Sequence, residues 1–129
     1  MLDHIGLSVK DVARSRAFYE AALKPLGIGV IMEVGPDLTE SGGPVVGFGK
    51  DGKPFFWIGG REHAGGATHV AFTAPDRQTV DAFYGAAVAA GGTENGAPGL
   101  RLHYHPDYYG AFVLDPDGHN IEAVCHAPR

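Results

Sequence analysis

Apolar and polar side chains alternate along residues 4–9, and the same alternation returns along residues 69–74. A period of two residues is typical of a β-strand that buries one face. The segments after Asp11 and Asp76 instead carry apolar side chains at helical spacing, and each aspartate can cap the first turn of a helix. The pattern therefore predicts a strand and then a helix at the start of each half of the chain.

Three further strand-like segments follow each predicted helix. In the first half they lie around residues 29–34, 45–49 and 54–59, and in the second half around residues 99–105, 110–114 and 120–125. Asp51-Gly52 and Asp117-Gly118 are typical of the tight turns that join antiparallel strands. The predicted order of elements is βαβββ, and it occurs twice.

The two halves are also related in sequence. Residues 4–23 align with residues 69–88 without a gap, at an offset of 65, and the identical pairs include a histidine, an aspartate and a Phe-Tyr dipeptide. A match that keeps one register through a strand, a loop and a helix indicates a duplicated module. We therefore expect an α+β fold with module 1 at about residues 1–65 and module 2 at about residues 66–129, merged into one domain.

Composition narrows the class of protein. Among the 129 residues, 20 are glycine and 9 are proline, which favours short strands and tight turns over a helical bundle. The formal charge is −5 at pH 7 and the basic residues are scattered, which argues against nucleic acid or an anionic membrane as a partner. No apolar run approaches the roughly 20 residues of a membrane span, and the N-terminus has no signal pattern, so we expect a cytoplasmic protein. The single cysteine, Cys125, excludes an intrachain disulfide.

Three side chains stand out as metal ligands. His4 and His69 occupy the same position in the two first strands, on the side that otherwise carries small residues. Glu122 lies in the last predicted strand between apolar neighbours, where an unpaired carboxylate is costly to bury. Two imidazoles and one carboxylate suit Zn, Ni, Mn or Fe(II) with open coordination positions. The alternative is that each histidine bonds the backbone and Glu122 is exposed on an edge strand.

The duplicated module and the C-terminal run Asp-Pro-Asp-Gly-His-Asn-Ile-Glu, residues 115–122, resemble the vicinal oxygen chelate superfamily. That superfamily includes glyoxalase I, fosfomycin-resistance thiol transferases, extradiol dioxygenases, methylmalonyl-CoA epimerase and bleomycin-resistance proteins. The resemblance implies a cup-shaped mixed sheet with the helices on the outside, and it places His4, His69 and Glu122 at three metal-ligand positions.

The fourth ligand position of glyoxalase I is filled differently in this sequence. The repeat offset pairs Glu122 with Trp57, whereas alignment on the two Asp-Gly turns pairs it with Phe56. Either residue supplies an aromatic ring and no oxygen ligand. A three-ligand site is therefore expected, with Trp57 or Phe56 as an apolar wall of the substrate pocket.

The segment 101–109 is rich in groups that could contact a substrate. His105, seventeen residues before Glu122, resembles part of the extradiol dioxygenase signature, although Phe112 stands where that signature has a tyrosine. We expect His105, Tyr108 or Tyr109 to bind substrate or relay a proton, with His105, Tyr109 and Glu122 as catalytic candidates. Arg101 is the candidate for an anionic group of the substrate. The alternative is a polar loop with an aromatic lid.

Together these features predict a metal-dependent enzyme that acts on a small molecule with two adjacent oxygens, the metal serving as a Lewis acid. Lyase or isomerase chemistry of the glyoxalase kind, or a related thiol transfer, is placed first by resemblance. The alternatives are an extradiol-type dioxygenase and a non-catalytic protein that sequesters an antibiotic. We also expect a homodimer with the ligands in two facing half-cups, and leave open whether modules pair within a chain or across the dimer.

Overall fold

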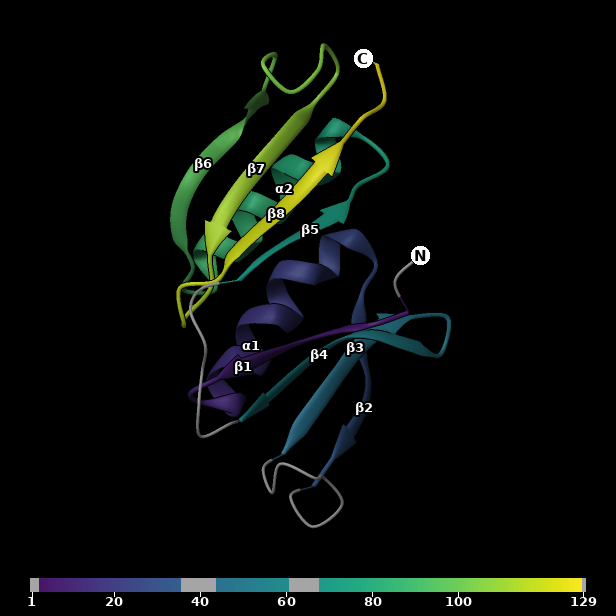
Figure 1. Ribbon diagram of the computed structural model, residues 1–129, viewed down its shortest axis with the longest axis vertical. Coiled ribbons are helices and arrows are strands. Elements are labelled where there is room, and N and C mark those ends of the chain that lie inside the picture. Colours follow the sequence, from purple (N-terminus) through teal and green to yellow (C-terminus); the bar gives the residue numbers. More distant parts are fainter. Residues whose placement is uncertain (1–2, 36–43, 61–67, 129) are drawn as a thin grey trace.

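The computed structural model describes residues 3–35, 44–60 and 68–128, and it contains the predicted βαβββ order twice (Figure 1). Module 1 comprises β1 (Ile5–Val9), α1 (Val12–Leu23), the short 3₁₀ helix η1 (Lys24–Leu26), β2 (Gly29–Val34), β3 (Val45–Lys50) and β4 (Lys53–Gly60). Module 2 comprises β5 (His69–Thr73), α2 (Arg77–Ala89), β6 (Thr93–Leu100), β7 (Tyr109–Leu114) and β8 (Asn120–Cys125).

Local interactions explain where these elements begin and end. Asp11 Oδ1 accepts a hydrogen bond from the Arg14 amide at 3.1 Å, and Asp76 Oδ1 accepts one from the Thr79 amide at 2.7 Å, so both predicted N-caps are confirmed. Asp51-Gly52 joins β3 to β4 with positive φ at both residues, 51° and 77°, as a tight hairpin turn requires.

The strand predicted around residues 99–105 is displaced. β6 instead spans Thr93–Leu100, and residues 101–108 form the connection to β7. The β6–β7 register shifts between Glu94 and Gly96 and again between Gly96 and Gly99. Pairing with β7 therefore stabilises a Gly- and Pro-containing segment that has little strand propensity of its own.

Each module forms its own four-stranded mixed sheet. The strand orders are β1-β4-β3-β2 and β5-β8-β7-β6, with the first strand parallel to the last and the other neighbours antiparallel. The sheets do not join into one closed sheet, and each presents one open face. The other faces carry α1 and α2, which contact each other. A single hydrophobic core includes residues of both modules, among them Phe56 and Phe72, whose ring centroids are 5.3 Å apart.

The turn between β7 and β8 fastens module 2 to module 1. The buried Asp115 carboxylate accepts a hydrogen bond from Tyr19 Oη at 2.6 Å. Burial and the Asp115 charge raise the pKa of Tyr19, so its phenol stays protonated and donates. His119 accepts from the Thr68 amide through Nδ1 and donates from Nε2 to the Ser8 carbonyl, each at 3.0 Å. Residues 115–119, part of the segment that resembles the superfamily, therefore hold the two modules together through hydrogen bonds.

Replacing Tyr19 by phenylalanine should weaken this contact between the modules. The variant loses a buried hydrogen bond to a charged group, so we expect the free energy of unfolding to fall by about 1.5–3 kcal/mol in urea denaturation. Tyr84 occupies the equivalent repeat position and donates to Glu94 at the surface, which makes Tyr84→Phe the matched control. Equal losses in the two variants would show that burial of the Tyr19–Asp115 bond adds nothing to stability.

Candidate functional site

The open face of module 2 brings His69 and Glu122 together. His69 begins β5 and Glu122 lies in the middle of the neighbouring strand β8, where it pairs with Ala71. His69 Nε2 lies 2.9 Å from Glu122 Oε1. The Glu122 side chain is only 1% exposed, whereas the His69 side chain is 53% exposed. This geometry supports the prediction that the two side chains share a site, and it excludes the exposed edge position as the explanation for Glu122.

A buried carboxylate needs a partner for each oxygen, and Glu122 has both. Its second oxygen, Oε2, accepts a hydrogen bond from Tyr108 Oη. Gly110 makes room for this contact, because a Cβ at that position would lie 3.3 Å from Glu122 Oε2 and 3.2 Å from the Tyr108 ring. Burial and the bond to Glu122 raise the pKa of Tyr108, which keeps its phenol neutral and donating.

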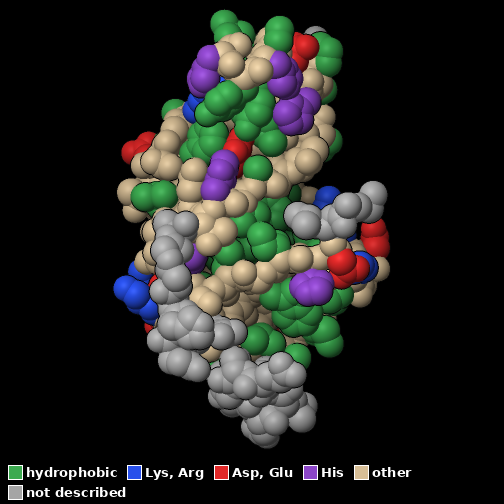
Figure 2. All heavy atoms as spheres, in the orientation of Figure 1, with side chains coloured by type: hydrophobic (Ala, Val, Ile, Leu, Met, Phe, Trp, Pro, Cys, Tyr) green, Lys and Arg blue, Asp and Glu red, His purple; other side chains and the backbone are tan. Residues whose placement is uncertain are grey.

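Aromatic and imidazole side chains surround this pair. A cavity of about 510 Å³ is lined by His69, His103, Tyr104, His105, Tyr108, Phe112, Glu122 and His126. Figure 2 shows histidine side chains gathered with hydrophobic ones over the half of this face that module 2 forms. Segment 101–109 thus contributes His103, Tyr104, His105 and Tyr108 to the lining of this cavity, and His126 adds to it from the end of β8.

Two residues predicted to contact substrate, Tyr109 and Arg101, make other contacts in the structure. Tyr109 is on the helix side of β7, where its hydroxyl donates to Asp81 at 2.6 Å and the Arg77 guanidinium lies 5.1 Å from its ring. The expectation that Tyr109 reaches the Glu122 site is therefore corrected, because strand alternation turns it to the opposite face. Arg101 lies over the Phe112 ring at 5.4 Å and donates to two β6 carbonyls at 2.8 Å each.

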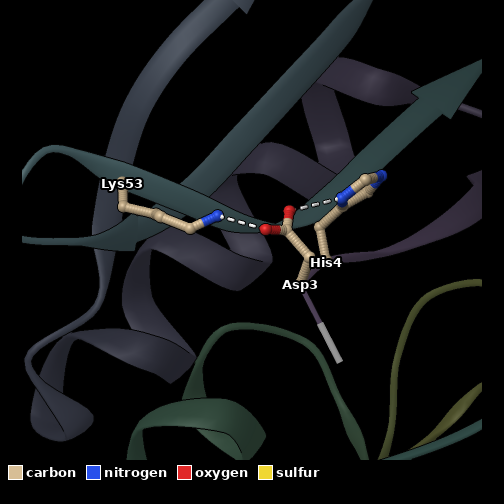
Figure 3. Close-up of polar contacts among 3 residues, drawn as sticks. All are labelled: Asp3, His4 and Lys53. Atoms are coloured by element: carbon tan, nitrogen blue, oxygen red, sulfur yellow. Dashed lines mark hydrogen bonds and ion pairs between the residues drawn. The ribbon is translucent and has the colours of Figure 1, made fainter. Parts of the chain in front are cut away.

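On the open face of module 1, His4 is held by a charged pair (Figure 3). Asp3 Oδ1 lies 2.8 Å from His4 Nδ1, and Lys53 Nζ donates to Asp3 Oδ2 at 3.0 Å. Hydrogen bonds from His4 and then Lys53 lower the pKa of the Asp3 carboxyl, so the ionised form is favoured. A carboxylate on Nδ1 fixes the proton there and leaves Nε2 as the ligand atom, the usual arrangement behind a metal-binding histidine.

Strand register identifies the module 1 counterpart of Glu122. Trp57 pairs with Gly6 on β1 and with Gly47 on β3, as Glu122 pairs with Ala71 and Phe112 in module 2. Trp57 covers Gly47 so closely that a Cβ there would lie 2.8 Å from the indole. Phe56 points the other way and is buried in the core, so Trp57 is the residue on the open face, although Phe56 also lines the cavity that His4 and His69 border.

His4 does not join His69 and Glu122 in one cluster. Among the residues that the structure describes, no three His, Cys, Asp or Glu side chains are placed to hold a metal ion together. His4 and His69 do border a common cavity of about 360 Å³ between β1 and β5. The structure thus places His69 with Glu122 on module 2 and His4 with Asp3 on module 1.

Sequence reasoning missed His126 as part of the module 2 wall. The β7–β8 pairing of Tyr109 with Cys125 places the preceding Tyr108 beside the following His126. A two-residue turn at Asp117-Gly118 would instead have paired Tyr109 with His126, one residue out of register, because residues 115–119 form the connection from β7 to β8. Strand alternation alone would have separated Tyr108 from Tyr109.

The duplicated βαβββ fold is that of a protein of the vicinal oxygen chelate type. More particularly, the chain belongs to the Glyoxalase/Bleomycin resistance protein/Dioxygenase superfamily, whose sequence model matches residues 1–123. Among functionally curated proteins, none matches this sequence. No helix within the described ranges is long and apolar enough to cross a membrane.

Solved structures support the same assignment. A glyoxalase/bleomycin resistance protein from Albidiferax ferrireducens T118 is 31% identical, with 99% of both chains covered and a TM-score of 0.75. Glyoxalase I from Zea mays is 20% identical with a TM-score of 0.71, over 95% of this chain and 43% of that one. A mutant of FosX from Listeria monocytogenes, complexed with Mn(II) and 1S,2S-dihydroxypropylphosphonic acid, is 21% identical with a TM-score of 0.68, over 96% and 88%. The last two similarities bear on the fold alone.

Proposed function

We propose that this protein is a metal-dependent enzyme that acts on a small molecule with two adjacent oxygens. The observation that carries the proposal is the buried Glu122 carboxylate, which directs Oε1 toward His69 Nε2 at 2.9 Å inside an open cavity. A nearly fully buried carboxylate beside an accessible imidazole is a costly arrangement for packing alone and a suitable pair of donors for a divalent metal. When bound, such a metal acts as a Lewis acid on the substrate oxygens.

The third ligand in this proposal is His4, supplied by a second copy of the chain in a homodimer of two-fold symmetry. His4 is 61% exposed and its Asp3 contact leaves Nε2 directed away from that carboxylate. Both module faces are open in the single chain, so pairing the module 1 face of one copy with the module 2 face of another would enclose the cavity. A two-fold interface would form two such sites.

The protein groups around the metal position would then have distinct tasks. Glu122 and the two histidines would hold the ion, and the Tyr108 phenol stays protonated at pH 7 and can donate a hydrogen bond near developing negative charge. Trp57 would form an apolar wall on the module 1 side, where glyoxalase I has an oxygen ligand. Phe112 leaves the site without the tyrosine hydroxyl of the dioxygenase signature, which favours lyase or isomerase chemistry, or thiol transfer, over ring cleavage.

A second candidate is a sequestering protein that binds a planar ligand without metal. The aromatic side chains Tyr104, Tyr108 and Phe112 around the module 2 cavity favour it. Elemental analysis of protein purified without chelator separates the two candidates. We expect one divalent metal per chain, followed by activity in the chemistry that this metal prefers. Protein that stays metal-free after incubation with Zn, Ni, Mn and Fe(II) would exclude the enzyme proposal.

A further inference from the structure

The two oxygens of Glu122 have separate partners. Oε1 faces His69 Nε2, and Oε2 accepts the Tyr108 hydroxyl. Gly110 leaves this contact uncrowded, since a Cβ there would lie 3.3 Å from Oε2 and 3.2 Å from the Tyr108 ring. The carboxylate is therefore oriented with one oxygen toward the proposed metal position and the other directed away from it.

Tyr108 is itself held in place by a ring cluster. Its ring lies edge-on to His105, His126 and Tyr104, with centroid distances of 5.5, 5.2 and 4.8 Å. His105 Nε2 lies 2.6 Å from His126 Nδ1, and the two imidazoles are stacked. This pair links the β6–β7 connection to the end of β8, and both imidazoles lie together beside the Tyr108 ring.

The hydrogen bonds around His105 fix its tautomer. The Asp107 amide donates to His105 Nδ1 at 3.0 Å, so the ring proton is on Nε2 and is donated to His126 Nδ1. A metal ion on His105 Nε2 would need a proton on Nδ1, where the Asp107 N–H already points. The His105–His126 pair is therefore suited to bracing Tyr108 and not to holding a second metal.

We infer that Tyr108 is a positioning residue for Glu122: its hydroxyl retains Oε2, so that Glu122 offers the metal Oε1 alone, and the His105–His126 pair holds Tyr108 in place. The inference rests on the proposed metal-dependent function. Without the hydroxyl, Oε2 would be buried with no donor, and the carboxylate would be free to rotate toward the metal or away from it.

The test is the affinity of the full-length protein for Zn²⁺, measured by competition with a chromophoric chelator. Tyr108→Phe is expected to bind Zn²⁺ about 10- to 100-fold more weakly than the parent, the usual cost of losing a group that orients a ligand. Tyr109→Phe is the matched control, since it removes a hydroxyl one residue away that bonds Asp81 on the other face of the sheet. It should bind Zn²⁺ as the parent does.

A spectroscopic readout separates positioning from general loosening of the fold. With Co²⁺ in place of Zn²⁺, Tyr108→Phe should change the visible absorption bands, because the coordination by Glu122 changes, while Tyr109→Phe should not. Thermal melting checks that each variant is folded. If Tyr108→Phe does not fold, His126→Phe carries the test, since it keeps a ring beside Tyr108 but removes the acceptor for His105, and a smaller loss in the same direction is expected.

The possible outcomes are distinct. A parent protein that binds neither metal overturns the proposed function and this inference with it. A parent that binds metal, with Tyr108→Phe unchanged in affinity and spectrum, overturns the inference and leaves the proposed function standing. Equal losses in Tyr108→Phe and Tyr109→Phe also overturn it. Selective loss in Tyr108→Phe supports it.

Discussion

Replacing Glu122 by alanine is expected to abolish stoichiometric binding of a divalent metal and, with it, any catalytic activity. Glu122 is the one carboxylate among the three proposed ligands, and its Oε1 is the atom that faces His69. We expect the affinity to fall at least about 100-fold, beyond the range typical of residues that only orient a ligand. Elemental analysis after gel filtration and a competition assay with a chelator both measure the loss.

The duplication supplies a matched control for this substitution. Trp57 occupies the same register position in module 1 that Glu122 occupies in module 2, and it cannot ligate a metal. Trp57→Ala should therefore keep the metal and change the preference among substrates. Glu122→Gln, which keeps the shape of the side chain, tests the role of the charge if the alanine variant is unstable. A Glu122→Ala protein that holds metal as tightly as the parent would show that the proposed site is wrong.

The sequence was sufficient to predict the order of elements because each one has a local cause. The N-caps Asp11 and Asp76, the Asp51-Gly52 turn and the period-two strands all appear in the structure as predicted. The error at β6 has a different origin. Residues 93–100 become a strand through pairing with β7, an interaction between segments that local propensity does not describe.

The candidate site was less predictable, because it depends on the parity of strands and on contacts between elements. His69 and Glu122 could be placed on one face from alternation alone, since both lie within regular strands. Whether Trp57 or Phe56 is the counterpart of Glu122 depended on an offset of one residue, and that residue decides between the open face and the core. The same parity separates Tyr108 from Tyr109 at the point where the loop enters β7.

The location of His4 raises the question of which copy of the chain supplies it to the proposed site. His4 precedes β1, and its face and its Asp3 partner agree with a metal ligand, yet it lies outside the module 2 pair in a single chain. Such an arrangement is expected when a site is completed by a second subunit, because the chain's own fold then need not bring all ligands together. The sequence of one chain specifies each ligand but not the copy from which it comes.

If His4 comes from a second copy, two inactive variants should complement each other in metal binding. His4→Ala and Glu122→Ala should each fail to bind metal as homodimers, but a mixture of the two proteins should recover binding after subunit exchange. In a mixed dimer, the His4→Ala chain contributes an intact His69 and Glu122, and the Glu122→Ala chain contributes an intact His4. One of the two sites in that dimer is complete, and the other lacks both residues.

The expected recovery can be stated as a fraction. Random exchange at equal concentrations makes half of the dimers mixed, and each has one complete site of two, so metal content should rise from near zero to about a quarter of that of the parent. The mixture of His69→Ala with Glu122→Ala is the matched control, since both residues belong to the same module and no pairing of these chains restores a site. If modules 1 and 2 instead share a metal within one chain, neither mixture gains metal. Recovery in the first mixture alone would therefore assign His4 to the partner copy, and it would do so even before the substrate is identified.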